Sequence, residues 1–301
     1  MAYIGLENML AVTHSFLFSE EWGHRLSAEA PRLGRNNGLV RQNVQVVQDG
    51  GFDLDSGERV VVPTPPATER IIPQAVPDVA GAPAPFATTT VTVSLIDTLS
   101  AALALGDDAV ALNFANAWRH GGGYKHGAEA QEEGHCRLLP QLIHSLEYVP
   151  YPILEQEGEC LLIRNLVAVR EVGSYRLCKS QGLVNMLTSA MPCGDCGAPG
   201  QMPWNGTVNL IIRGVPHAAR ASGFAKLVLG AWGCGAFGNP PELVAKLFRE
   251  QLSSPEFRGA FSNVVFAIVD PRGDGNFRPF YLEVAKIDES GGYQGEARAD
   301  L

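Results

Sequence analysis

The sequence predicts an α/β protein in which helices cover both faces of a central sheet. Segments typical of strands and helices alternate along residues 88–270. The predicted strands are mostly apolar runs without strict alternation, such as AVALNFA at 109–115, and such runs indicate strands that are buried on both faces. A chain of 301 residues with 46% hydrophobic residues is long enough to bury this core. We therefore expect a three-layer α/β/α sandwich.

The region before the sandwich has a different composition. Residues 1–62 include a Gly-Gly turn at 50–51 and a predicted strand at 58–62. Residues 63–85 are too rich in proline for a long helix, and we expect them to form a linker or surface strap. We divide the chain into an N-terminal extension (1–87), which we expect to pack against the main domain, the main domain itself (88–287) and a loose polar tail (288–301).

The elements of the main domain follow from their apolar runs and their boundary residues. The helix at 97–106 ends at Gly106, and a helix is predicted at 132–142 after the loop that contains a Gly-Gly-Gly run. The other predictions are strands at 88–96, 109–115, 160–169, 182–190, 225–232 and 263–270 and a helix at 240–252.

Composition excludes several classes of function. A net charge of -9 and a pI near 5.3 argue against a broad basic face, so we expect no direct DNA binding. The N-terminus lacks a basic region, and Glu7, His14 and Glu20 interrupt its apolar residues, which argues against a signal peptide or a membrane span. We expect a cytoplasmic monomer whose six cysteines are reduced.

The first stretch that carries chemistry is the segment LNFAN at 112–116 with the glycine-rich loop after it. A strand that ends in such a loop places backbone N–H groups at the carboxyl edge of the sheet, where anionic ligands commonly bind. Three adjacent glycines, at 121–123, add backbone entropy that folding must overcome and they pack nothing. This pattern favours a phosphate ligand close to the backbone, and a plain flexible turn is the alternative.

The second stretch is Gln131-Glu132-Glu133. Neighbouring α-carbons are about 3.8 Å apart and their side chains diverge, so these glutamates do not resemble the separated pair of a typical glycosidase. We expect them to have distinct roles, with one carboxyl kept protonated near a phosphorylated sugar and acting as a general acid. Alternatively, they only begin the helix, where the helix dipole favours acidic residues.

The third stretch is a second glycine-rich turn at 230–239, between a strand and a helix that begins near Pro240-Pro241. Its glycines allow the backbone to wrap around a diphosphate and to donate N–H groups to it. Two such loops on neighbouring strands would close over one diphosphate. The spacing matches neither a Walker loop nor a dinucleotide fingerprint, and Phe237 either covers a sugar or base or packs as a plug.

The remaining polar motifs are weaker. Cys193-Gly194-Asp195-Cys196 is a single CxxC without a second one, so reduced thiols are favoured over a metal site. Cys234 has no neighbouring histidine that would mark it as a nucleophile. We expect the histidines at 120, 126 and 135 at the surface, and we expect no metal and no cofactor.

Three segments in order resemble the poly(ADP-ribose) glycohydrolase family of microbial type. They are LNFAN-x4-GGG-x7-QEE, LVLGAWGCGAFGN and NVVFAIVD. The resemblance spans residues 88–285, is weakest at 144–160 and 193–207, and weakens again before residue 63. It implies a macrodomain fold with a mixed central sheet and a catalytic domain at 88–287.

The resemblance also implies the roles of individual residues. It implies that Glu133 is the catalytic acid and later the base, that Glu132 positions the ribose hydroxyls, and that no metal is needed. Substrate binding is implied for Asn116, Gly121, Gly122, Gly123, Gln131, Gly233, Cys234, Gly235, Ala236, Phe237, Gly238 and Asn239. The implied ligands are ADP-ribose or poly(ADP-ribose), and ADP-ribosylated protein is a further implied partner.

Two other functions remain open from the sequence. One is a hydrolase that removes single ADP-ribose groups from proteins, for example from arginine. The other is a reader that binds ADP-ribose without cleaving it, although a pure binder needs no acid at the reacting bond.

Overall fold

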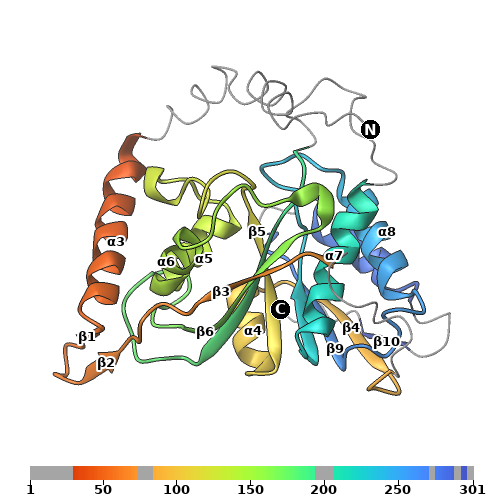
Figure 1. Ribbon diagram of the computed structural model, residues 1–301, viewed down its shortest axis with the longest axis horizontal. Coiled ribbons are helices and arrows are strands. Elements are labelled where there is room, and N and C mark those ends of the chain that lie inside the picture. Colours follow the sequence, from red (N-terminus) through yellow and green to blue (C-terminus); the bar gives the residue numbers. More distant parts are fainter. Residues whose placement is uncertain (1–29, 74–83, 194–206, 271–274, 288–292, 297–301) are drawn as a thin grey trace, which may run out of the picture.

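The computed structural model describes residues 30–73, 84–193, 207–270, 275–287 and 293–296 (Figure 1). Its elements, in chain order, are α3 (Ala30–Gln48), β1 (Gly51–Asp53), β2 (Arg59–Val61), β3 (Thr68–Ile71), β4 (Thr89–Ser94), α4 (Thr98–Leu105), β5 (Ala109–Ala115), η3 (Tyr124–His126), α5 (Gln131–Leu138), α6 (Pro140–Glu147), η4 (Glu155–Glu157), β6 (Cys160–Val167), β7 (Leu183–Ala190), α7 (Thr207–Ala221), β8 (Lys226–Leu229), α8 (Pro241–Leu252), β9 (Asn263–Ala267), α9 (Phe277–Val284) and β10 (Tyr293–Glu296).

The main sheet is mixed and has the strand order β10-β4-β9-β8-β5-β7-β6-β3. The pairs from β10 to β7 are parallel, whereas β6 is antiparallel to both of its neighbours, β7 and β3. In Figure 1, α5 and α6 lie on one side of β5, and α7 and α8 lie on the other. The predicted three-layer α/β/α sandwich with a mixed sheet is confirmed.

Each face of the sheet has its own apolar core. On β5, Val110 and Leu112 pack with α7, α8 and α9, whereas Ala111 and Ala115 pack with α4, α5 and α6. Successive side chains of a strand point to opposite faces, so a strand between two helical layers is mainly apolar on both faces. This is why AVALNFA is apolar except at Asn113, whose buried side chain is hydrogen-bonded.

Three sequence predictions differ from the structure. The helix predicted at 132–142 is two helices, because Pro140 has no N–H for the helical ladder and Leu139, with non-helical backbone angles, separates α5 from α6. The proline-rich strap contains β3, which pairs antiparallel with β6 at one edge of the main sheet. The tail predicted to be loose contains β10, which pairs parallel with β4 at the other edge.

The N-terminal residues share a core with the main sheet. Val46 of α3 and Phe52 and Val60 of the β1–β2 hairpin pack against Val167 and Val169, at the end of β6. The first described residues therefore pack against the sheet instead of forming a core of their own. No helix in the described part of the chain has the length and apolar character needed to cross a bilayer.

Candidate active site

The two glycine-rich loops leave neighbouring strands of the sheet. The first glycine loop, residues 117–130, follows β5, and the second glycine loop, residues 230–240, follows β8, which pairs directly with β5. The first loop leads to α5 on one face of the sheet and the second leads to α8 on the other. Where adjacent parallel strands send their chains to opposite faces, a crevice opens at their carboxyl ends. The two glycine loops therefore begin at adjacent strands of the sheet.

Gln131, the first residue of α5, attaches this helix to β5. Its side-chain oxygen accepts a hydrogen bond from the Phe114 N–H at 2.8 Å, and its amide nitrogen lies 3.0 Å from both the Leu112 carbonyl and the Thr98 hydroxyl. The amide therefore acts as a short cross-link between helix and strand. It fixes where the next two residues, Glu132 and Glu133, begin the helix.

Each of the two glutamates is held by one carboxylate oxygen. Glu132 Oε2 accepts a hydrogen bond from the Asn116 N–H at 2.8 Å, and Glu133 Oε1 accepts one from the Gly123 N–H at 2.7 Å. The other oxygens, Glu132 Oε1 and Glu133 Oε2, are buried and have no hydrogen-bond partner among the described residues. Buried polar atoms without partners are rare and require an explanation. We take these two oxygens as candidate acceptors for a ligand.

The Gly-Gly-Gly run is explained by its contacts. A Cβ on Gly122 would lie 2.4 Å from Glu133 Oε1 and 2.8 Å from Glu132 Oε2, so the backbone there lies directly over both carboxylates. On Gly121 a Cβ would meet Ile143 Cδ1 at 2.6 Å, and on Gly123 it would meet Ala128 Cβ at 2.6 Å. Gly121 and Gly122 also have positive φ angles, of 66° and 57°. The plain flexible turn does not account for these contacts.

The environment of Glu132 favours its protonated form. Burial raises the pKa of this carboxyl well above its usual range, the Asn116 N–H opposes the shift, and the charge of nearby Glu133 adds to it. Asn116 contributes its side chain to the loop, since its Oδ1 accepts hydrogen bonds from the N–H groups of Trp118 and Arg119.

Two buried residues that the sequence did not predict as part of the site support α5. His135 Nδ1 lies 2.9 Å from Asn113 Oδ1, and Asn113 Nδ2 donates a hydrogen bond to the Thr188 hydroxyl at 3.3 Å. Burial lowers the pKa of His135 to about 4, so its ring is neutral at pH 7. The spacing of four residues between Gln131 and His135 was the available signal, since it places both on the helix face toward β5.

The second glycine loop differs from the first in its backbone N–H groups, some of which have no acceptor in the described part of the chain. Its N–H groups at Cys234, Gly238 and Asn239 bond to carbonyls of the same segment. The N–H groups of Gly235, Ala236 and Phe237, between them, donate to no acceptor in the described part of the chain. Gly235 and Ala236 are exposed. Successive free N–H groups form a concave site for anions such as phosphate.

The base of the second glycine loop is rigid. Gly233 has a φ of 74°, and a Cβ there would lie 2.4 Å from Asn239 Nδ2. Asn239 is buried and donates to the Pro192 carbonyl at 2.9 Å. Phe237 is half-buried and packs against the core on the α8 face. The structure therefore brings the predicted residues 233–239 together at the end of β8.

Several predictions about histidines and cysteines need correction. His126 is exposed as expected, but His135 is buried, and half-buried His120 stacks on Tyr151 with ring centroids 3.9 Å apart. Four cysteines, at 136, 160, 178 and 234, are free, whereas Cys193 is disulfide-bonded, contrary to the expectation of reduced thiols. Cys196 lies outside the described residues. Burial raises the pKa of Cys234 to about 12, which does not favour a nucleophilic role.

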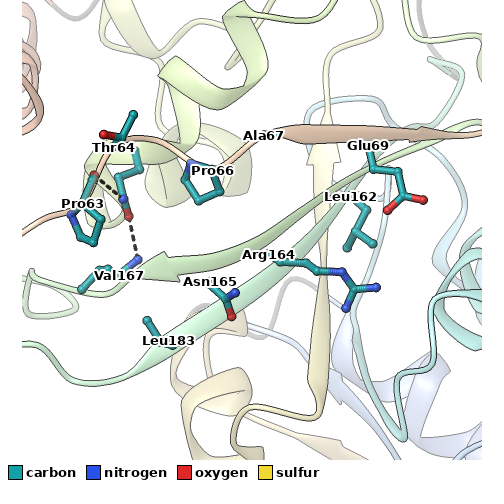
Figure 2. Close-up of a pocket in the computed structure, with 11 residues that line it drawn as sticks. Pro63, Thr64, Pro66, Ala67, Glu69, Leu162, Arg164, Asn165, Val167 and Leu183 are labelled. Atoms are coloured by element: carbon teal, nitrogen blue, oxygen red, sulfur yellow. Dashed lines mark hydrogen bonds between the residues drawn. The ribbon is translucent and has the colours of Figure 1, made fainter.

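A groove of about 530 Å³ lies elsewhere on the molecule (Figure 2). Pro63, Pro66 and Ala67 line one side of it, and Arg164 and Leu183 line the other. Leu183 is the first residue of β7, whereas the glycine loops follow the last residues of β5 and β8. The groove is therefore at the opposite end of the parallel strands. We place the candidate site at the glycine loops because the buried carboxylates and the free N–H groups are there.

The sheet order and the two loops at its carboxyl edge define a macrodomain-like α/β protein. The chain is 30% identical to the crystal structure of poly(ADP-ribose) glycohydrolase (PARG) from Thermomonospora curvata, with a TM-score of 0.72 over 83% of this chain and 99% of that one. Residues 40–161 match the family described as microbial-type PARG, catalytic domain. The chain belongs to this microbial-type PARG family.

Two further structures to which the chain is similar contain bound ligands. The T. curvata enzyme bound to the inhibitor ADP-HPD is 30% identical, with a TM-score of 0.69 over 84% of this chain and 99% of that one. The glycohydrolase from Deinococcus radiodurans in complex with ADP-ribose is 31% identical, with a TM-score of 0.64 over 73% of this chain and 95% of that one. No curated protein matches the chain.

Proposed function

We propose that the protein hydrolyses the ribose–ribose O-glycosidic bonds of poly(ADP-ribose) and releases ADP-ribose, with Glu133 as the general acid and base. The main support is the carboxylate pair at the start of α5. Each carboxylate accepts a hydrogen bond from a backbone N–H through one oxygen, and its other oxygen is buried with no hydrogen-bond partner among the described residues. Family membership and the ADP-ribose complex of the D. radiodurans relative support the choice of ligand.

In the proposed reaction, Glu133 donates its proton to the ribose oxygen that leaves. The bond between this oxygen and the anomeric carbon breaks while that carbon gains oxocarbenium character. The Glu133 carboxylate then removes a proton from a water molecule whose oxygen bonds to the anomeric carbon. One water is consumed, and the products are ADP-ribose and a polymer that is shorter by one unit.

The other residues hold the substrate in this proposal. Glu132 Oε1 accepts hydrogen bonds from ribose hydroxyls, and the half-buried Asn116 lies at the same ribose. The free N–H groups of Gly235, Ala236 and Phe237 bind the diphosphate, and Phe237 orients the ribose next to the bond that breaks. Fixed donors of this kind reduce the entropic part of the barrier because the substrate is already oriented.

The test is the release of ADP-ribose by the wild type and by Glu133→Gln. The substrates are poly(ADP-ribose) and, in parallel, proteins with single ADP-ribose groups on arginine or on acidic residues. We expect release from the polymer, a loss of about 100-fold to 10,000-fold in kcat in the variant, and ADP-ribose affinity within about threefold of the wild type.

The matched control is Glu69→Gln, which alters an exposed carboxylate on β3, outside both glycine loops, and is expected to keep its activity within about twofold. If ADP-ribose were released only from proteins that carry single ADP-ribose groups, the substrate would be such a protein and not the polymer. Tight binding of ADP-ribose without release from any substrate would make the protein a reader, and the proposal would be wrong.

A further inference from the structure

We propose that Asn43, on α3, is a positioning residue that fixes the first glycine loop against α5. This inference rests on the proposed function, because it concerns the geometry of the same site. Asn43 lies outside both glycine loops and is completely buried, with 0% of its surface exposed. Its amide group meets three separate parts of the chain: η3, the end of α5 and the segment after β6.

The first contact of Asn43 is with the end of α5. Its Nδ2 donates to the carbonyl oxygens of Cys136 and Arg137, each at 3.0 Å. The last carbonyls of a helix have no partner within the helix, and Pro140 has no N–H to offer to Cys136. Asn43 therefore acts as a C-terminal cap supplied by another helix. The capped helix carries Glu132 and Glu133 in its first turn.

The second contact is with the first glycine loop. Asn43 Nδ2 lies 3.1 Å from the hydroxyl of Tyr124, a side chain that is only 2% exposed. Tyr124 directly follows Gly123, whose N–H holds Glu133 Oε1 at 2.7 Å. One amide group thus touches both elements that meet at Glu133, the helix that carries the carboxylate and the loop that holds it.

The third contact sets the orientation of the amide. Asn43 Oδ1 accepts a hydrogen bond from Arg170 Nε at 2.8 Å, and Arg170 also donates to Gln42 Oε1 at 2.8 Å. Since a guanidinium only donates hydrogen bonds, it holds the amide oxygen on its own side and turns the amide nitrogen toward α5. Without it, rotation of the amide would place an oxygen against two carbonyl oxygens.

The test compares Asn43→Ala with Asn185→Ala, which removes a similar asparagine far from the site. Asn185 is 4% exposed, its Nδ2 donates to the carbonyls of Asp107 and Ala109 at 3.0 and 2.9 Å, and its Oδ1 accepts from the Asn165 N–H at 3.1 Å. These groups lie at the starts of β5 and β7 and near the end of β6, at the opposite end of the sheet from the glycine loops.

We expect both variants to unfold at lower temperature, because both lose buried hydrogen bonds. Only Asn43→Ala is expected to lower kcat on poly(ADP-ribose), by about tenfold or more, with KM within about threefold, because the second glycine loop is untouched. Only Asn43→Ala is also expected to speed hydrogen exchange, by about tenfold, at the amides of residues 117–130.

Equal exchange at 117–130 in the two alanine variants, or an unchanged kcat in folded Asn43→Ala, would overturn the positioning role. If Asn43→Ala does not fold, Tyr124→Phe is the deciding variant, because it removes one hydroxyl and keeps the ring. We expect hydrogen exchange at residues 117–130 to be about threefold faster in this variant. Unchanged exchange would contradict the proposal. An inactive wild type would refute the glycohydrolase function, whereas the exchange data would still decide whether Asn43 fixes the loop.

Discussion

The two glycine loops lie side by side at the carboxyl edge of the sheet, yet they use glycine for different purposes. In the first glycine loop, glycine lets the backbone lie against two buried carboxylates, and the N–H of Gly123 is already bonded to Glu133. In the second glycine loop, three consecutive N–H groups have no acceptor in the described part of the chain, and two of their residues are exposed.

Glycine-rich loops can therefore serve two purposes, either to position neighbouring side chains or to bind an anion. A loop whose donors are bonded to protein carboxylates fixes those carboxylates, whereas a loop with free donors is prepared for an external anion. Changes in the first loop should therefore affect mainly kcat, and changes in the second should affect mainly the affinity for ADP-ribose.

The largest effect is expected for Gly122→Ala in the first loop. The added Cβ would lie 2.4 Å from Glu133 Oε1 and 2.8 Å from Glu132 Oε2, so one or both carboxylates must move. We expect kcat on poly(ADP-ribose) to fall by about 100-fold or more, with ADP-ribose affinity within about threefold, measured by turnover and by calorimetry.

The control for Gly122→Ala is Gly57→Ala, in the turn between β1 and β2. Gly57 also has a positive φ, of 81°, but a Cβ there would meet no atom within 4 Å. It therefore reproduces the backbone strain without the collision, and its kcat should stay within about twofold. Equal losses of kcat in the two variants would mean that strain, and not the carboxylates, explains the effect.

A smaller effect, and on affinity, is expected for Gly233→Ala in the second loop. At a φ of 74°, its Cβ would lie 2.4 Å from Asn239 Nδ2 and 2.8 Å from Met191 Cγ, which displaces the base of the loop. We expect the Kd for ADP-ribose to rise by about 10-fold to 100-fold, with kcat at saturation within about threefold.

Gly223→Ala, in the turn between α7 and β8, provides the comparison, because Gly223 also has a positive φ, of 81°, but a Cβ there would meet nothing within 4 Å. Its Kd should remain within about twofold of the wild type. If Gly233→Ala lowered kcat by a larger factor than it raised the Kd, the second loop would not act mainly on affinity, and the proposed difference between the two loops would be wrong.

The sequence was sufficient to predict the two loops because each carries its own local signal. Glycine after a buried strand indicates backbone close to a ligand, and the doubled glutamate at 132–133 marks the start of a helix, so both could be read without knowledge of distant contacts. The strands of the main sheet were predictable for the same reason, since AVALNFA and similar runs are apolar at nearly every position.

The supporting residues were not predictable because their signals are not local. Asn43 contacts Arg137 and Arg170 across 94 and 127 residues of sequence, and nothing in the surrounding helix marks it. β3 is a strand inside a proline-rich segment, stabilised by pairing with β6 and not by its own composition. The family match begins at residue 40, upstream of the segment 88–285 in which the motifs were recognised.

The smallest effect concerns the stability cost of burying the Glu132 carboxyl beneath the first glycine loop. The pKa of Glu132 is raised by burial above its ordinary value of 4.5. The protonated form is therefore favoured in the folded state, and the corresponding stability is present below pH 4.5 and is lost as the pH rises through the raised pKa. Glu132→Gln keeps an oxygen for the Asn116 N–H but carries no charge, so it should raise Tm by about 2–4 °C at pH 8 and by less at pH 4.5.

The control is Glu147→Gln, since the Glu147 side chain is 37% exposed and its replacement should shift Tm by less than about 1 °C at either pH. A lower Tm for Glu132→Gln at pH 8, or the same increase at both pH values, would mean that burial of this carboxyl has no stability cost. The two glycine loops would then differ only in whether their N–H groups are bonded to protein carboxylates. A pH-dependent gain would instead show that the carboxylate held against the Gly-Gly-Gly backbone lowers the stability of the fold, which no residue of the more exposed second loop is expected to do.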